Sequence, residues 1–172
     1  MRWISYFLLA YIALGCQVAL GGYMEVKGAA PNLVLLVVIF ITVNAPREAG
    51  LLGAFLLGAM QDLMTIYPLG TWAVAYALVA MFVISTQEYV YREHPLTHFS
   101  LALSGGVICG VFLTIHGWVY PKLHGAAVLG AEGEGALRPF TGLMYTAILG
   151  PIVLGILQRM KRTFAFKAIR RM

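Results

Sequence analysis

Six long runs of apolar residues alternate with short segments rich in polar residues, glycine or proline. The runs span residues 3–20, 32–45, 49–66, 71–85, 97–120 and 139–157. Each is continuously apolar, whereas the strands of outer-membrane barrels alternate apolar and polar positions over about ten residues. Because a helix satisfies its own backbone hydrogen bonds in lipid, the pattern predicts an all-α membrane protein, a bundle of six transmembrane helices.

The first two runs differ from ordinary spans. The first follows Arg2 and ends in Ala19-Leu20-Gly21, which resembles a signal peptide with its cleavage site. We expect it to be retained as the first span. The second run follows Pro31, a residue well suited to a first helical position. It reaches only about 21 Å, less than the ~30 Å of a hydrocarbon core, so the second span is predicted to be short or to be extended by turn residues.

Glycines recur inside the runs at helical spacings. Gly50, Gly53 and Gly58 lie in the third run, and Gly106 and Gly110 are four residues apart in the fifth. In lipid, small residues let neighbouring helices approach closely. The sequence therefore predicts close helix packing at these positions.

The composition excludes an ordinary soluble domain. Of the 172 residues, 60% are hydrophobic and only 11% are charged, whereas a soluble domain carries about 25% charged residues. We predict one six-span domain over residues 1–157 and a basic cytoplasmic tail over residues 158–172. The net charge of +5 is concentrated in this tail, which favours contact with anionic lipid headgroups over nucleic acid. Its cations are Arg159, Lys161, Arg162, Lys167, Arg170 and Arg171.

The distribution of positive charge predicts the orientation. With six spans, both termini lie on the same side. The lysines and arginines on that side number nine, the six of the tail with Arg2, Arg47 and Arg92; the other side has Lys27, Lys122 and Arg138. The positive-inside rule then places both termini in the cytoplasm and the acidic loop of residues 121–138 outside.

Asp62 is a carboxylate within an apolar run, where a charge is costly unless it is paired, protonated or at a polar boundary. Asn32 lies fifteen residues before Arg47, and Asp62 lies fifteen after it. In an antiparallel hairpin the two share one height, about 22 Å from the turn. They are predicted to be neighbours. One interpretation is a structural polar pair or a cap near the outer interface; the other is contact with a partner or ligand.

Residue patterns typical of enzymes are missing from the sequence. It has no Gly-x-Ser-x-Gly, no Walker A motif and no His-Glu-x-x-His. His94 and His98 have the i, i+4 spacing of a metal pair, but Pro95 lies between them. Cys16 and Cys109 lie in apolar runs, as buried small side chains do. We predict no catalytic activity, no cofactor and no metal site.

Residues 31–70 carry a pattern of motifs. Pro-Asn opens the second run, a short basic turn contains Arg47, the glycine-bearing third run includes Asp62-Leu63, and Pro68-Leu69-Gly70 precedes the fourth. This pattern resembles the rod shape-determining protein family MreD, and the chain length and six-span layout agree with it. The resemblance marks Asn32, Arg47, Asp62, Pro68 and Gly70 as candidate structural or partner-contact residues.

The resemblance implies a function without catalysis. MreD-like proteins are scaffolds of the cell-elongation machinery in the bacterial cytoplasmic (inner) membrane, and they associate with MreC. The same machinery includes MreB, RodZ, RodA and a class B penicillin-binding transpeptidase, and it organises peptidoglycan synthesis. The family is also similar in fold to the substrate-binding subunits of energy-coupling factor transporters.

That similarity in fold supplies the alternative hypothesis, a small-molecule (vitamin-type) binding subunit of such a transporter. This hypothesis predicts a polar-lined cavity that opens outward near Asn32 and Asp62. Few aromatic or polar residues cluster at that height in the sequence, which favours the scaffold. A membrane enzyme is the third hypothesis, and it lacks any set of catalytic residues.

Overall fold

The computed structural model describes residues 3–23, 25, 30–65, 68–86, 95–124 and 138–164, and these residues form six α-helices without a strand. The predicted all-α class is confirmed, with one helix in each apolar run. The helices are α1 (Trp3–Gly21), α2 (Leu33–Asn44), α3 (Arg47–Asp62), α4 (Thr71–Thr86), α5 (Pro95–His124) and α6 (Arg138–Phe164).

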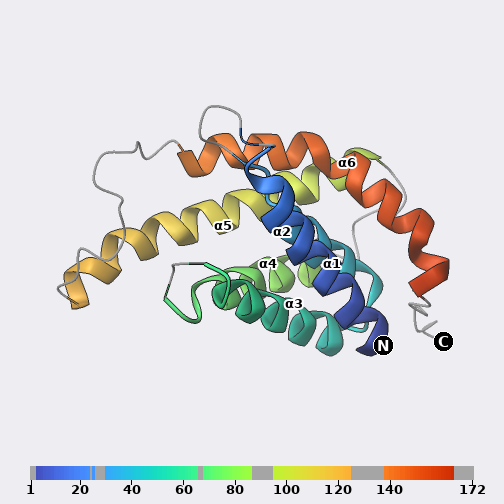
Figure 1. Ribbon diagram of the computed structural model, residues 1–172, viewed down its shortest axis with the longest axis horizontal. Helices are drawn as coiled ribbons and strands as arrows, with labels where there is room; N and C mark the ends of the chain where they lie inside the picture. The colour runs from blue at the N-terminus through green and yellow to red at the C-terminus, as the bar shows by residue number, and fades with distance from the viewer. Residues whose placement is uncertain are drawn as a thin grey trace.

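The centre of the bundle is α2, which contacts all five of the other helices (Figure 1). Its side chains from Val34 to Asn44 are all buried. A helix that is apolar on every side is stable only when protein or lipid surrounds it completely, and here protein does so. With 12 residues, α2 is only about 18 Å long. The prediction of a short second helix is therefore confirmed.

The other helices surround α2 and turn large apolar side chains outward. By length and composition, Ile4–Gly21 and Leu96–Val119 are long and apolar enough to cross a membrane, and Leu33–Asn44, Thr71–Thr86 and Met144–Arg159 are shorter apolar helices. Outward-facing apolar residues occur on every outer helix, as in a protein surrounded by lipid. Examples are Ile4, Tyr11 and Val18 on α1, Phe55 on α3, Met81 on α4, Val111 on α5, and Ile148 and Ile152 on α6.

Three helices differ from the predicted runs by more than one residue. The third helix begins at Arg47, directly after Pro46, and ends at Asp62, although the apolar run continues to residue 66. The fifth helix continues to His124. The sixth continues to Phe164 without a break at residue 157, so the proposed boundary of the basic tail lies inside a continuous helix.

Several predicted connections lie outside the described residues. These are residues 87–94 between α4 and α5, residues 125–137 of the acidic loop, and the tail from residue 165 onward.

Glycines in the third run allow helix backbones to approach, as predicted. A Cβ atom on Gly58 would lie 2.5 Å from the Ala73 Cα, so α3 and α4 touch there through their backbones. Gly53 faces the ring of Tyr6, and its carbonyl accepts a hydrogen bond of 2.6 Å from the Tyr6 hydroxyl. Gly150 supports a similar contact between α6 and α5, where a Cβ would lie 2.7 Å from the Ala102 Cβ.

We expect Gly58→Ala to lower the free energy of unfolding by about 3 kcal/mol, because the added methyl forces α3 away from the backbone of α4. The matched control is Gly155→Ala in α6, where a Cβ meets no atom within 4 Å. This control should be neutral or should stabilise by up to about 1 kcal/mol through helix propensity. Thermal unfolding of both variants in detergent measures the difference, and equal melting temperatures would contradict the contact.

Candidate functional site

Asp62, the last residue of α3, caps the start of α4. Its Oδ1 accepts from the backbone N–H of Trp72 at 2.8 Å, and its Oδ2 accepts from those of Gly70 at 2.9 Å and Ala73 at 3.2 Å. The first N–H groups of a helix have no partner within the helix, and the N-terminal end of the helix dipole attracts negative charge. The carboxylate, only 2% exposed, therefore completes α4 from a neighbouring helix.

The Pro-Leu-Gly motif shapes the turn that presents these N–H groups. The Thr71 hydroxyl donates to the Pro68 carbonyl at 2.8 Å, and the Thr71 N–H reaches the same oxygen at 3.2 Å. Gly70 has a φ of 99°, a backbone conformation that glycine adopts without the steric cost other residues incur. The three candidate residues Asp62, Pro68 and Gly70 thus form one structural unit that joins α3 to α4.

Asn32 caps α2 in the usual way. Its Oδ1 accepts from the N–H of Leu35 at 2.9 Å, as an N-cap side chain does. Its own backbone N–H donates to the Thr146 hydroxyl of α6 at 2.8 Å. The start of α2 is therefore attached to α6 as well as being capped locally.

The Tyr76 hydroxyl joins α4 to α2 and α3. It lies 2.6 Å from the Gln61 Oε1 and 3.0 Å from the Asn32 Nδ2. Since a hydroxyl has a single proton, Tyr76 donates to Gln61 and accepts from Asn32. Through the Tyr76 hydroxyl, Asn32 is linked to Gln61, the residue before Asp62. Asn32 and Asp62 were predicted to be neighbours, and in the described part of the chain they do not form a direct pair. Asp62 faces the α4 backbone instead.

Gln17 on α1 completes the set of polar contacts around the start of α2. Its side-chain Oε1 accepts from the N–H of Leu33 at 2.7 Å, and its Nε2 donates to the Pro31 carbonyl at 3.1 Å. Inside lipid, a helix end needs such partners because water is absent. The sequence analysis did not identify Gln17, Tyr76 or Thr146 as site residues. The signal that would have identified them is a lone polar side chain within an apolar run.

The candidate residues do not converge on one site. Arg47 is exposed at the first position of α3, at the opposite end of that helix from Asp62. The fifteen residue steps from Arg47 to Asp62 along α3 separate the two by about 22 Å. Asn32 belongs to the cap of α2, and Asp62 with its turn belongs to the cap of α4. Among these candidates, the structure therefore presents a buried helix cap at Asp62, a half-buried helix cap at Asn32 and an exposed cation at Arg47.

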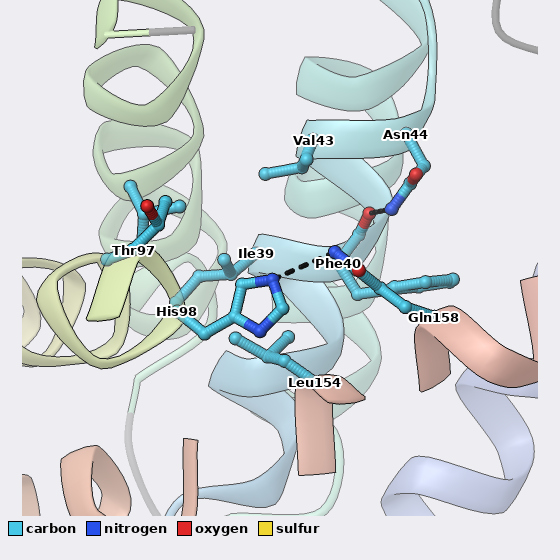
Figure 2. Close-up of a pocket in the computed structure, with 9 residues that line it drawn as sticks. Ile39, Phe40, Val43, Asn44, Thr97, His98, Leu154 and Gln158 are labelled. Atoms are coloured by element: carbon cyan, nitrogen blue, oxygen red, sulfur yellow. Dashed lines mark hydrogen bonds between the residues drawn. The ribbon is translucent and has the colours of Figure 1, made fainter. Parts of the chain in front are cut away.

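A small pocket lies at the other end of α2, between α2, α5 and α6 (Figure 2). His98 from α5 and Gln158 from α6 meet there, with their Nε2 atoms 2.9 Å apart. In the tautomer with its proton on Nδ1, His98 accepts at Nε2 from the amide N–H of Gln158. Apolar side chains, including Ile39, Val43 and Leu154, form most of the rest of the wall, together with Asn44 and Thr97.

Among the described residues, the polar groups at these caps bond to helix ends and to one another. The Asp62 oxygens are both engaged by backbone N–H groups, and His98 contacts the side-chain amide of Gln158. Among the described residues, no group of three or more His, Cys, Asp and Glu side chains is placed to hold a metal ion. His94, which has the i, i+4 spacing of a metal pair with His98, lies outside the described residues. The arrangement stabilises helix ends.

We expect Asp62→Leu to lower the free energy of unfolding by about 3 kcal/mol or more, because it leaves three buried N–H groups without an acceptor. Asp62→Asn keeps one acceptor oxygen and should lower the free energy of unfolding by about half as much. The control is Glu48→Gln, an exposed carboxylate in the first turn of α3, which should shift stability by no more than about 0.5 kcal/mol. Thermal unfolding in detergent tests this order, and a loss for Asp62→Leu no larger than that for the control would contradict the cap.

The first 122 residues match the family model described as rod shape-determining protein MreD. The match covers α1 to α4, most of α5 and both helix caps. No curated protein and no solved structure matches the chain. Because the family model covers well over half of the sequence, the chain belongs to the MreD family of rod shape-determining proteins.

Proposed function

We propose that this protein is a non-enzymatic scaffold of the bacterial cell-elongation machinery, which binds MreC in the cytoplasmic membrane and helps to organise peptidoglycan synthesis. The observation that carries the proposal is the MreD match over residues 1–122, which supports a rod-shape function. The family and the apolar helices together indicate an integral membrane protein. MreC, RodA, RodZ, MreB and a class B penicillin-binding transpeptidase are the partners that this function implies.

The internal use of the buried polar groups supports a scaffold over an enzyme. Asp62, Asn32, Gln17 and Gln61 each bond to backbone or side-chain groups of neighbouring helices. A catalytic carboxylate must instead reach a substrate. These residues serve to hold helices at fixed positions, which is what a binding platform requires.

We propose that all six helices cross the membrane, with both termini in the cytoplasm. The start of α1, the α2–α3 turn and the end of α6 lie at the same end of the bundle (Figure 1). Arg47 and Arg159 are exposed at that end. An excess of basic residues favours the cytoplasmic side. The last turns of α6 then continue from the spanning residues 1–157 into the basic region 158–172, where their cations meet anionic headgroups.

The contacts of Asn32 and Asp62 weigh against the alternative of a vitamin-binding transporter subunit. That alternative requires polar groups facing an outward cavity near these two residues. In the structure, Asn32 is hydrogen-bonded to Leu35, Tyr76 and Thr146, and Asp62 is hydrogen-bonded to the backbone of α4. The pocket in Figure 2 lies at the opposite end of α2 and has mainly apolar walls. We therefore favour the scaffold.

The scaffold proposal predicts that the tagged protein, extracted from its own cells in mild detergent, copurifies with an MreC-like protein at near-equal stoichiometry. Helix association in lipid depends on close shape matching, so Gly58→Ala should reduce this recovery, whereas Gly155→Ala should preserve it. Mass spectrometry of the eluate measures both. Recovery of an ATPase pair with a coupling membrane subunit, or of a bound vitamin, would refute the scaffold in favour of the transporter subunit.

The topology proposal predicts opposite behaviour of reporters at two positions. A green fluorescent protein fused after Phe164 should fluoresce, because that end of α6 lies in the cytoplasm. An alkaline phosphatase fused after Glu25, which follows α1, should be active because it lies outside. The controls exchange the two reporters. The green fluorescent protein after Glu25 should then not fluoresce, and the alkaline phosphatase after Phe164 should be inactive. Active phosphatase after Phe164 would contradict the proposed orientation.

A further inference from the structure

The turn between α3 and α4 shows apolar side chains where a turn in water shows polar ones. Leu63 and Leu69 are each 76% exposed, and Met64 is 56% exposed. The sequence from residue 63 to residue 70 contains no charged residue. Turns in water favour Gly, Asn, Asp and Ser, whose side chains bond to the backbone or to solvent. We refer to Leu63, Met64 and Leu69 as the apolar tip.

The length of the α3–α4 hairpin indicates where the apolar tip lies in a membrane. Each helix has 16 residues and is about 24 Å long. At the opposite end, Arg47 and Glu48 are exposed charges that belong at the membrane surface. The two helices of a hairpin that starts there end about 6 Å short of the far side of a ~30 Å hydrocarbon core, and only the turn extends beyond them. By contrast, the 30 residues of α5 reach about 45 Å and cross it fully.

In the described part of this turn, several backbone N–H groups are satisfied from within, as immersion in hydrocarbon requires, whereas the buried Thr65 hydroxyl has no hydrogen-bond partner. Asp62 accepts from the N–H groups of Gly70, Trp72 and Ala73. The N–H of Met64 donates to the Gln61 carbonyl at 2.9 Å. Asp62 is only 2% exposed, so its charge faces protein rather than the surroundings of the tip. The carboxylate therefore allows a turn to exist where water cannot solvate it.

We propose that the apolar tip is immersed among the lipid acyl chains of the outer leaflet. This inference rests on the proposed arrangement in which α3 and α4 cross the membrane. The occupant of the surface is lipid because the tip is uncharged, exposed and short of the interface. A hairpin shorter than the bilayer is accommodated by local thinning. The α3–α4 side of the protein then faces a thinner membrane than the α5–α6 side does.

The test places one cysteine in the purified full chain, with Cys16 and Cys109 replaced by alanine, in vesicles of a dioleoyl phospholipid. The positions are Leu69→Cys at the tip and Glu25→Cys as the control, which is exposed and follows the end of α1. A membrane-impermeant maleimide should label the tip roughly tenfold more slowly than the control, because it reacts with thiolate in water. After the protein is unfolded in detergent, the labelling rates of the tip cysteine and the control cysteine should become equal.

A second readout identifies what surrounds the tip. Bimane attached to Leu69→Cys should be quenched by phospholipids with brominated acyl chains, and bimane attached to Glu25→Cys should not. Equal labelling rates in vesicles would overturn the proposal, since the tip would then lie in water. Slow labelling without quenching by bromine would also overturn it, because protein, such as a second copy of this chain, would then cover the tip.

Two further controls separate this inference from the proposed function. If Glu25→Cys reacts only after the vesicles are permeabilised, the protein has been inserted in the inverted orientation. The labelling rates of both positions are then compared after permeabilisation, and this comparison still shows where the tip lies. Leu63→Cys repeats the measurement at a second exposed position, in case Leu69→Cys fails to fold. Copurification with MreC does not enter the result, so failure of the MreC-binding proposal leaves this inference standing, whereas a different topology of α3 and α4 would remove its basis.

Discussion

A helix that begins inside a bundle needs hydrogen-bond acceptors from other helices, and this requirement determines much of the structure. The first N–H groups of α4 find theirs in the Asp62 carboxylate at 2.8–3.2 Å. Water cannot supply these bonds inside lipid. The cap holds the end of α3 against the start of α4, and Gly58 lets their backbones touch next to it. Removal of the carboxylate would thus release both the helix start and the packing beside it.

The short central helix extends the same constraint to the whole bundle. Because α2 has only 12 residues and is buried throughout, its start lies where α1, α4 and α6 must provide polar groups. Gln17 and Thr146 bond to its backbone, and Tyr76 bonds to its capping residue Asn32. These bonds fix the height of four helices relative to one another. Isolated polar residues in apolar helices are costly in lipid, and here each is compensated by a specific partner.

The sequence predicted the six helices because hydropathy responds directly to burial in lipid or protein. It failed at helix ends, since an apolar turn such as Leu63-Met64 has the same hydropathy as a helix. For Asp62 it offered a structural pair or cap as one interpretation and contact with a partner or ligand as the other, and the structure shows a cap. The N–H groups that bond to Asp62 lie eight to eleven residues later, at the start of α4. Local spacing in the sequence does not reveal such partners. Tyr76 was missed because its role depends on a contact 44 residues away.

These contacts bear on how such a protein recognises partners. With Asp62, Asn32 and Gln17 committed to its own helix ends, the bundle presents mainly apolar side chains on its outer helices. Between apolar surfaces in lipid, association depends on how closely the shapes fit, because lipid itself is an equally apolar partner. The shape of the bundle is set by the caps and the glycine contacts. Buried polar residues therefore influence partner binding through the positions of the helices, even where no partner touches them.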